Sequence, residues 1–127
     1  MKNVVLLGAT GSIGSSTLNV LRQNKDMFTL KAIALHQNLD IALEIVNEFS
    51  PEHVFISDKN ISTDHPIFSS GSKIMTCLED LKLVIQNPAI EIVISAISGF
   101  AGLQSSYWAI EAGKTTLIAN KESIVSA

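Results

Sequence analysis

A short apolar run that ends in a glycine-rich turn constrains the fold of this chain more than any other feature. Val4 to Leu7 is continuously apolar and rich in branched side chains, which is typical of a strand buried on both faces of a parallel sheet. Gly8 ends the run, and the spacing Gly8-x-x-Gly11-x-x-Gly14 leads into a predicted helix from about Ser12 to Asn24. A strand, a glycine turn and a helix in this order are the context of a dinucleotide-binding fingerprint.

Each position in this turn has an expected role at a bound dinucleotide. Gly8 permits the tight turn, Gly11 lets the backbone approach a pyrophosphate, and Gly14 allows close packing of helix on strand. The amides of Thr10, Gly11, Ser12 and Ile13 lie at the positive end of the helix and can donate to phosphate oxygens. The hydroxyls of Thr10 and Ser12 add further donors. The spacing favours NAD(P) as the ligand class.

Strand and helix patterns alternate along the rest of the chain. Further strands are expected over 28–35, 53–57, 73–75, 91–96 and 114–119. Helices are expected from the N-cap Asn38 to Phe49, from a Thr76–Glu79 capping box to Gln86, and over 100–111. The polar stretch 58–72 is predicted to be a surface excursion with room for one helical turn.

Apolar periodicity predicts which side of each helix faces the core. The residues expected to point inward are Ile13, Thr17, Val20 and Leu21; Ile41, Ala42, Ile45, Val46 and Phe49; Leu78, Leu81, Val84 and Ile85; and Leu103, Tyr107 and Ile110. The alternation predicts an α/β fold: a Rossmann-like, doubly wound and mainly parallel sheet with helices on both faces. We expect residues 1–127 to form a single NAD(P)-binding domain of this kind.

Composition excludes several other classes. With 127 residues and 46% hydrophobic residues, the chain can bury the core of one domain. A net charge of -3 without a basic stripe disfavours a nucleic-acid partner, and the apolar runs are too short to span a membrane. No signal peptide is recognisable, and the single cysteine, Cys77, excludes an internal disulfide. We therefore expect a cytoplasmic protein.

The end of the second predicted strand bears on the choice between NAD and NADP. An Asp or Glu at this point would accept hydrogen bonds from the ribose hydroxyls of NAD, but the sequence has His36, Gln37 and Asn38. A neutral segment with hydrogen-bond donors suits a 2′-phosphate better than a diol. Asn38 serves equally well as a helix cap alone or as both cap and ligand.

Other chemically capable residues give weaker signals. His36, His53 and His65 are scattered without metal-ligand spacing, so no metal site is predicted. Cys77 is most simply a small apolar filler at a helix start. Lys121 and Glu122, beyond the last predicted strand, are placed either to contact substrate or cofactor or to form a surface ion pair.

Three segments together resemble one family, the 1-deoxy-D-xylulose 5-phosphate reductoisomerases. These are Leu7–Leu18 with the glycine turn, Ile97–Leu103, and Ala112–Val125 with its specific Ala-Asn-Lys-Glu-Ser motif. The resemblance covers essentially the whole chain but corresponds to the family's N-terminal NADPH-binding domain only. It implies rearrangement of 1-deoxy-D-xylulose 5-phosphate and its reduction to 2-C-methyl-D-erythritol 4-phosphate, in non-mevalonate isoprenoid biosynthesis.

The resemblance also implies roles for individual residues. Thr10 to Ile13 would hold the cofactor phosphates, and His36, Gln37 and Asn38 would lie at the adenosine 2′-phosphate. Some members carry Gly-Lys just before this Asn, where this chain has His36-Gln37. A protonated His36 could partly replace that lysine charge. Asn120 and Glu122 would lie at the cofactor, and Lys121 would reach the substrate.

Other parts of the family's machinery lie downstream of this segment. The resemblance implies that a divalent cation, Mg²⁺ or Mn²⁺, polarises the substrate oxygens, but the carboxylates that bind it and most of the homodimer contacts lie in the catalytic and C-terminal domains. We therefore expect this chain to bind NADPH without turning over substrate. A non-catalytic NAD(P)-binding module remains an alternative.

Another NAD(P)-dependent reductase domain also remains an alternative, although two particular kinds fit poorly. A short-chain reductase needs a Tyr-x-x-x-Lys pair, but the only tyrosine is Tyr107 and Glu111 stands four residues later. A semialdehyde-type dehydrogenase needs a nucleophilic cysteine beyond the nucleotide domain, and Cys77 is too early.

Overall fold

Strands and helices alternate in the computed structural model, which describes residues 1–97 and 100–118. In chain order the elements are β1 (Lys2–Leu7), α1 (Ser12–Gln23), β2 (Phe28–Leu35), α2 (Leu39–Phe49), β3 (His53–Ile56), the 3₁₀ helix η1 (Pro66–Ser69), β4 (Lys73–Met75), α3 (Leu78–Gln86), β5 (Ile92–Ser95), α4 (Phe100–Glu111) and β6 (Thr115–Ile118). The helical turn foreseen in the polar excursion is η1. Asn120, Lys121 and Glu122 lie outside the described residues.

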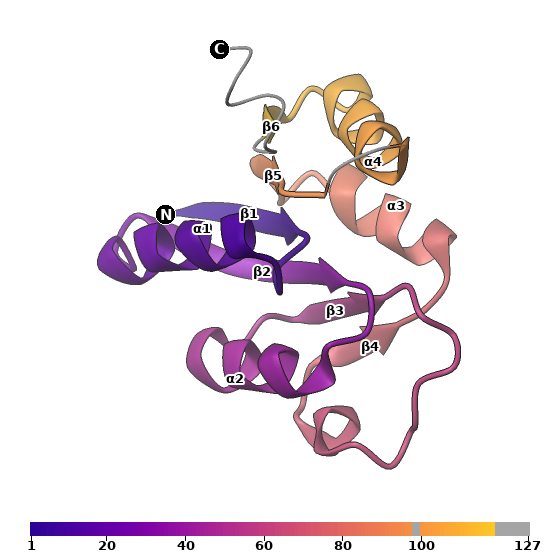
Figure 1. The fold of residues 1–127 in the computed structure, drawn as a ribbon. Coiled ribbons are helices and arrows are strands. Elements are labelled where there is room, and N and C mark those ends of the chain that lie inside the picture. The colour runs from indigo at the N-terminus through magenta and orange to yellow at the C-terminus, as the bar shows by residue number, and fades with distance from the viewer. Residues whose placement is uncertain (98–99, 119–127) are drawn as a thin grey trace.

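The described strands form one parallel sheet in the order β4-β3-β2-β1-β5-β6 (Figure 1). β1 lies in the middle, and the chain builds outward first on one side of it and then on the other. The strand order therefore reverses between β1 and β5. In open parallel sheets such a reversal opens a crevice at the carboxyl ends of the strands, where ligands bind.

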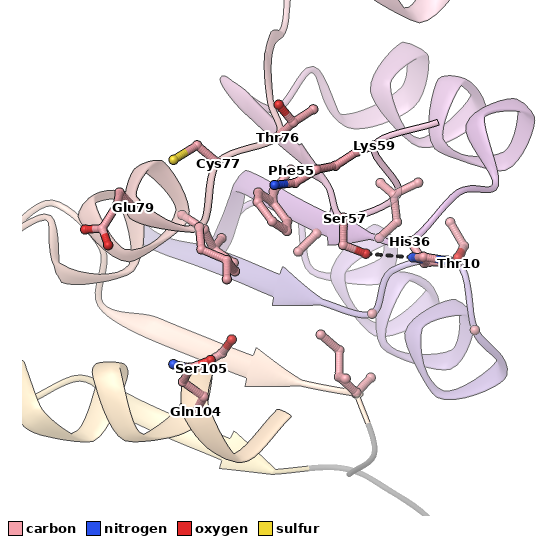
Figure 2. A pocket seen from close by; sticks show the side chains of 18 residues that line it. Thr10, His36, Phe55, Ser57, Lys59, Thr76, Cys77, Glu79, Gln104 and Ser105 are labelled. Atoms are coloured by element: carbon pink, nitrogen blue, oxygen red, sulfur yellow. Dashed lines mark hydrogen bonds between the residues drawn. The ribbon is translucent and has the colours of Figure 1, made fainter. Parts of the chain in front are cut away.

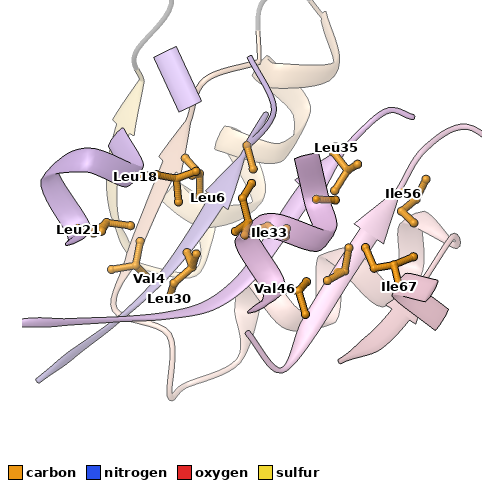
Figure 3. Packing of buried hydrophobic residues seen from close by; sticks show 14 residues of the cluster. Val4, Leu6, Leu18, Leu21, Leu30, Ile33, Leu35, Val46, Ile56 and Ile67 are labelled. Atoms are coloured by element: carbon orange, nitrogen blue, oxygen red, sulfur yellow. The ribbon is translucent and has the colours of Figure 1, made fainter. Parts of the chain in front are cut away.

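Buried apolar side chains lie on both faces of the sheet, which explains why β1 reads as a continuous hydrophobic run. One cluster packs β1, β2 and β3 against α1, α2 and η1 (Figure 3); its members include Val4, Leu6, Leu18, Ile33 and Val46. A second cluster on the other face includes Val5, Leu7, Leu81, Ile85 and Ala109, from β1, α3 and α4. Helices thus cover both faces, and the predicted Rossmann-like α/β fold is confirmed.

The inward face of α1 differs from the predicted one. Gly14, Leu18 and Leu21 are buried, whereas Val20 is 56% exposed, so its predicted inward position is wrong. Gly14 packs directly on the turn after β1, so the helix is rotated to place residues four and seven positions later against the sheet. In α2, Ile41 is likewise exposed, while Ala42, Ile45 and Val46 are buried as predicted.

The inward face of α4 also differs from the predicted one. Tyr107 and Ile110 in α4 are 61% and 60% exposed, whereas Ser105, Ser106 and Ala109 are buried. The predicted inward positions of Tyr107 and Ile110 are therefore wrong, because small side chains occupy the fully buried positions over residues 104–111 of the helix.

The start of α3 also differs from the predicted one. The helix begins at Leu78, which is exposed, and its N-cap is Cys77, without a side-chain cap hydrogen bond. The predicted Thr76–Glu79 capping box is therefore wrong. The helix starts one residue too late for Thr76 to occupy the cap position.

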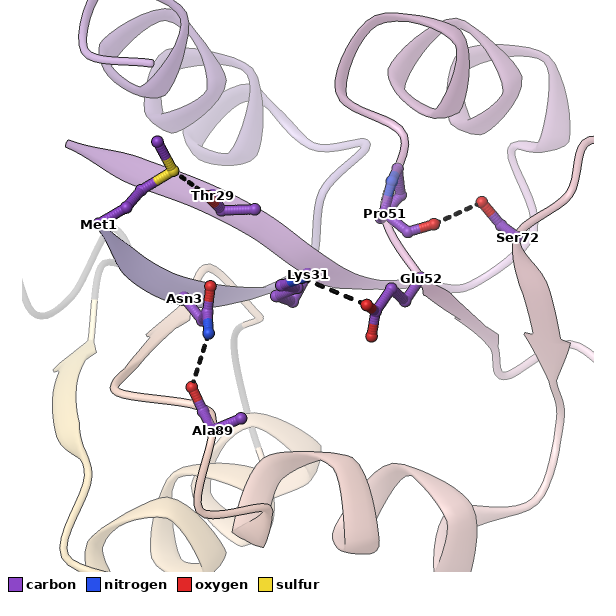
Figure 4. A network of polar contacts seen from close by, with 8 residues as sticks. All are labelled: Met1, Asn3, Thr29, Lys31, Pro51, Glu52, Ser72 and Ala89. Atoms are coloured by element: carbon purple, nitrogen blue, oxygen red, sulfur yellow. Dashed lines mark hydrogen bonds and ion pairs between the residues drawn. The ribbon is translucent and has the colours of Figure 1, made fainter. Parts of the chain in front are cut away.

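Polar contacts stabilise the amino edge of the sheet, where the strands begin (Figure 4). Asn3 Nδ2 donates to the Ala89 carbonyl oxygen over 2.9 Å, and the Lys31 ammonium lies 3.2 Å from a Glu52 carboxylate oxygen. Ser72 Oγ donates to the Pro51 carbonyl oxygen over 2.6 Å. The opposite edge, where the strands end, is where the glycine turn lies.

Candidate nucleotide-binding site

Two glycines of the turn after β1 are required by the protein itself. Gly8 has φ +83°, and a Cβ there would lie 2.9 Å from the Ala96 carbonyl carbon and oxygen after β5. A Cβ on Gly14 would lie 2.4 Å from the Gly8 carbonyl oxygen and 2.7 Å from that of Ala9. These contacts are too short for any side chain. The turn is therefore tightly packed between the end of β5 and the first turn of α1, and the predicted tight turn at Gly8 and helix packing at Gly14 are confirmed.

Gly11 is different, because nothing in the described protein demands a glycine there. Its φ of -84° and ψ of 177° are ordinary extended backbone, and a Cβ would meet only the Gly8 carbonyl oxygen at 3.8 Å. Gly11 is the N-cap of α1 and supplies no side-chain cap, so amides of the first turn are left without a side-chain acceptor. The missing side chain leaves room for a group that approaches those amides from outside. That arrangement suits a phosphate.

A cavity of about 960 Å³ opens at the carboxyl edge of the sheet (Figure 2). It lies against the ends of β1, β2, β3 and β5 and the starts of α3 and α4. Its lining residues are Gly8, Thr10, Gly11, Ala34, Leu35, His36, Phe55, Ser57, Lys59, Thr76, Cys77, Leu78, Glu79, Leu81, Ala96, Ile97, Gln104 and Ser105. The reversal of strand order between β1 and β5 falls within this set, where ligands are expected in this fold.

The predicted cofactor and substrate residues divide into three groups. Gly8, Thr10, Gly11 and His36 line the cavity, and Ser12 lines a smaller hollow of about 670 Å³ between α1 and α2 that shares Thr10 and Gly11. Ile13, Gly14, Gln37 and Asn38 line neither. Asn120, Lys121 and Glu122 lie outside the described residues.

The ends of β2 and β3 are joined by hydrogen bonds. His36 Nδ1 and Ser57 Oγ lie 2.8 Å apart, and the Asp58 amide donates to the His36 carbonyl oxygen over 3.0 Å. Asn38 Oδ1 accepts from the Ile41 amide over 3.3 Å, so the predicted N-cap is confirmed. Because its side chain is used in the cap, Asn38 positions the start of α2 beside this edge.

Sequence reasoning missed the contribution of β3 to the cavity. Ser57 and Lys59 follow β3 and line the cavity beside His36. The available signal was topological, since the residues after each parallel strand reach the same edge of the sheet. Cys77 is exposed and lines the cavity, so its predicted role as an apolar filler is wrong.

Charged groups away from the cavity form local pairs. His65 Nε2 lies 2.8 Å from Asp40 Oδ1, while its Nδ1 accepts from the Ile67 amide over 3.1 Å.

Within residues 1–97 and 100–118, no three or more His, Cys, Asp or Glu side chains gather in a way that could hold a metal ion. In the same residues, no helix has the length and apolar character needed to cross a membrane.

A doubly wound parallel sheet with a glycine turn at the reversal point defines a Rossmann-like nucleotide-binding domain. The family model described as 1-deoxy-D-xylulose 5-phosphate reductoisomerase matches residues 4–127. The chain belongs to this family, and the resemblance seen in the sequence is confirmed.

Relatives and solved structures agree with this assignment. A 1-deoxy-D-xylulose 5-phosphate reductoisomerase from Bacillus cereus strain AH187 is 43% identical over 127 residues, covering 100% of this chain and 33% of the relative. One from Leptospira biflexa is 38% identical over 126 residues. The chain thus spans about 33% of the length of the curated relatives it matches.

Two solved reductoisomerases show which ligands have been seen bound to similar proteins. A crystal structure of DOX-P reductoisomerase in complex with NADPH, fosmidomycin and magnesium has a TM-score of 0.85 and 34% identity, covering 98% of this chain and 31% of that one. The Zymomonas mobilis enzyme in complex with NADPH has a TM-score of 0.81 and 31% identity, covering 99% and 34%.

Proposed function

We propose that this chain is the NADPH-binding part of a reductoisomerase that converts 1-deoxy-D-xylulose 5-phosphate to 2-C-methyl-D-erythritol 4-phosphate. The observation that carries the proposal is the open position at Gly11, where the protein leaves space in front of the first turn of α1. The NADPH complexes of similar proteins support the choice of ligand.

The residues of the site fit a dinucleotide. Thr10, Gly11, Ser12 and Ile13 would hold the pyrophosphate through backbone amides at the helix start, with Gly8 and Gly14 fixing the turn. His36, Gln37 and Asn38 would lie at the adenosine ribose, with Asn38 holding the segment through its cap.

Bound NADPH supplies the hydride for reduction. The contribution of the described residues is to bind and orient it. Asn120 and Glu122 are proposed cofactor contacts and Lys121 a substrate contact, by resemblance to the family.

The divalent cation is assigned to the rest of the enzyme. The described residues offer no cluster of His, Cys, Asp or Glu side chains that could bind it. We further propose that residues 1–127 form one domain, that the longer enzyme is a cytoplasmic homodimer acting on a small phosphorylated sugar, and that this chain alone lacks turnover.

Calorimetric titration of the chain with NADPH and with NADH tests the proposal. We expect NADPH to bind more tightly than NADH. Gly11→Val should abolish binding of both by blocking the approach of the pyrophosphate. Gln23→Val, which introduces the same valine side chain at the far end of α1, should leave both affinities unchanged. Absence of binding by the unaltered chain at millimolar dinucleotide, or normal binding by Gly11→Val, would contradict the proposal.

A further inference from the structure

The end of β2 lacks the fixed positive charge that a 2′-phosphate attracts. The three residues after Leu35 are His36, Gln37 and Asn38, and none carries a permanent charge. A side chain from another element could supply this charge only if the fold brings that element to the end of β2.

The register of the sheet brings the segment after β3 to this place. Leu35 pairs with Ile56, and the two segments that follow β2 and β3 stay side by side beyond the strands. The Ser57 amide donates to the Leu35 carbonyl oxygen over 3.0 Å, and the His36–Ser57 side-chain contact follows. The residues that follow Ser57 are therefore held beside the end of β2.

Lys59 is the next basic residue along this segment, and its backbone is held on both sides. The Asp58 amide is bonded to His36, and Asp58 Oδ1 accepts from the Asn60 amide over 2.9 Å. This local turn presents Lys59 at the cavity, which it lines together with His36 and Ser57. Figure 2 shows its side chain extended across the cavity.

Lys59 is the only Lys or Arg among the described residues that line this cavity. The contacts between basic and acidic side chains found in residues 1–97 and 100–118 involve Arg22, Lys31 and His65, and not Lys59. The Lys59 ammonium is therefore available to a ligand. A lysine ammonium is a compact charge on a flexible four-carbon stem, and it binds phosphate groups without a fixed geometry.

We propose that Lys59 is the cation that selects the 2′-phosphate of NADPH in this chain, with Ser57 as a hydrogen-bond donor beside it. When the proton of the His36 ring is on Nδ1, Ser57 Oγ accepts from the ring and its own proton is left to donate to a phosphate oxygen. The selecting charge thus comes from the loop after β3 and not from the residues before Asn38. This inference rests on the proposed function.

The test is a comparison of NADPH and NADH affinities in the unaltered chain, Lys59→Gln and Lys73→Gln, measured by calorimetry at fixed ionic strength. Lys59→Gln should weaken NADPH binding about tenfold, equivalent to about 1.4 kcal/mol, and leave NADH binding within about twofold. Lys73 is an exposed lysine at the start of β4, away from the cavity, so Lys73→Gln provides the same charge change as a control.

The outcomes separate the two proposals. If the unaltered chain binds neither dinucleotide, the proposed function fails and the role of Lys59 falls with it. If it binds both and Lys59→Gln weakens them equally, or weakens neither, only the role of Lys59 is wrong. Because Lys59 is exposed, Lys59→Gln should have the same Tm as the unaltered chain.

Discussion

Adding a single methyl group should lower the stability of the fold at Gly14 and the affinity for dinucleotide at Gly11. At Gly14 the new Cβ would lie 2.4 Å from the Gly8 carbonyl oxygen and 2.7 Å from that of Ala9. Both are backbone atoms, so the helix or the turn must move. Overpacking of this kind costs up to about 3 kcal/mol, and the better helix propensity of alanine returns at most about 1 kcal/mol. Gly14→Ala should therefore lower the free energy of unfolding by about 2 kcal/mol.

At Gly11 the new Cβ would be 3.8 Å from its nearest protein neighbour, so the fold should tolerate it. Replacing an N-cap glycine by alanine costs up to about 1 kcal/mol. Gly11→Ala should keep most of the stability and lose dinucleotide affinity instead.

Urea unfolding followed by circular dichroism measures the first effect, and calorimetry with NADPH measures the second. For a chain of this size each kcal/mol lowers Tm by roughly 4 °C, so Gly14→Ala should melt about 8 °C lower. The reasoning is refuted if Gly14→Ala is as stable as the unaltered chain, or if Gly11→Ala is the less stable of the two.

Three further predictions concern stability. Asn38→Ala should lower the free energy of unfolding by about 1 kcal/mol because it removes the cap of α2, whereas Asn38→Asp should keep the cap. Urea unfolding at neutral pH checks this prediction, and equal losses of stability in the two variants would contradict it. The hydrogen bond and charge of Arg22 lower the pKa of Glu48, so their pairing stabilises the fold above the unfolded carboxyl pKa of about 4.3 and is lost as the pH falls through the lower folded value. Glu48→Gln should be less stable than the unaltered chain at neutral pH, with a difference that fades in acid, and a difference independent of pH would refute the assignment. Ser95→Ala and Ser106→Ala should leave stability unchanged or raise it, because both hydroxyls are buried without a partner in the described part of the chain; a clear loss in thermal melts would show that they are satisfied.

The fold was largely predictable because its signals are local and repeated. The run from Val4 to Leu7 is apolar at every position because both faces of β1 are covered, and Asn38 has the side chain that caps α2. Rotations of helices were not predictable. Val20 and Tyr107 lie on apolar stripes, yet contacts made by Gly14, Ser105 and Ala109 decide which side meets the sheet.

The candidate site was predictable where it follows one strand and one turn. The motif identified Gly8 as the tight-turn position and Gly14 as the helix-packing position, in agreement with the structure, and it left Gly11 as the position that a pyrophosphate would approach. Ser57 and Lys59 were missed because their proximity to His36 depends on the pairing of β2 with β3, which no local pattern encodes.

The most direct test of the central claim is to locate the bound cofactor by NMR. Amide resonances of the isotopically labelled chain would be followed during addition of NADPH. The account predicts the largest shifts at Thr10, Gly11, Ser12 and Ile13, followed by His36 and Lys59, with little change at the amino edge around Asn3 and Ser72. Shifts confined to residues away from the glycine turn, or no shifts at millimolar NADPH, would contradict it.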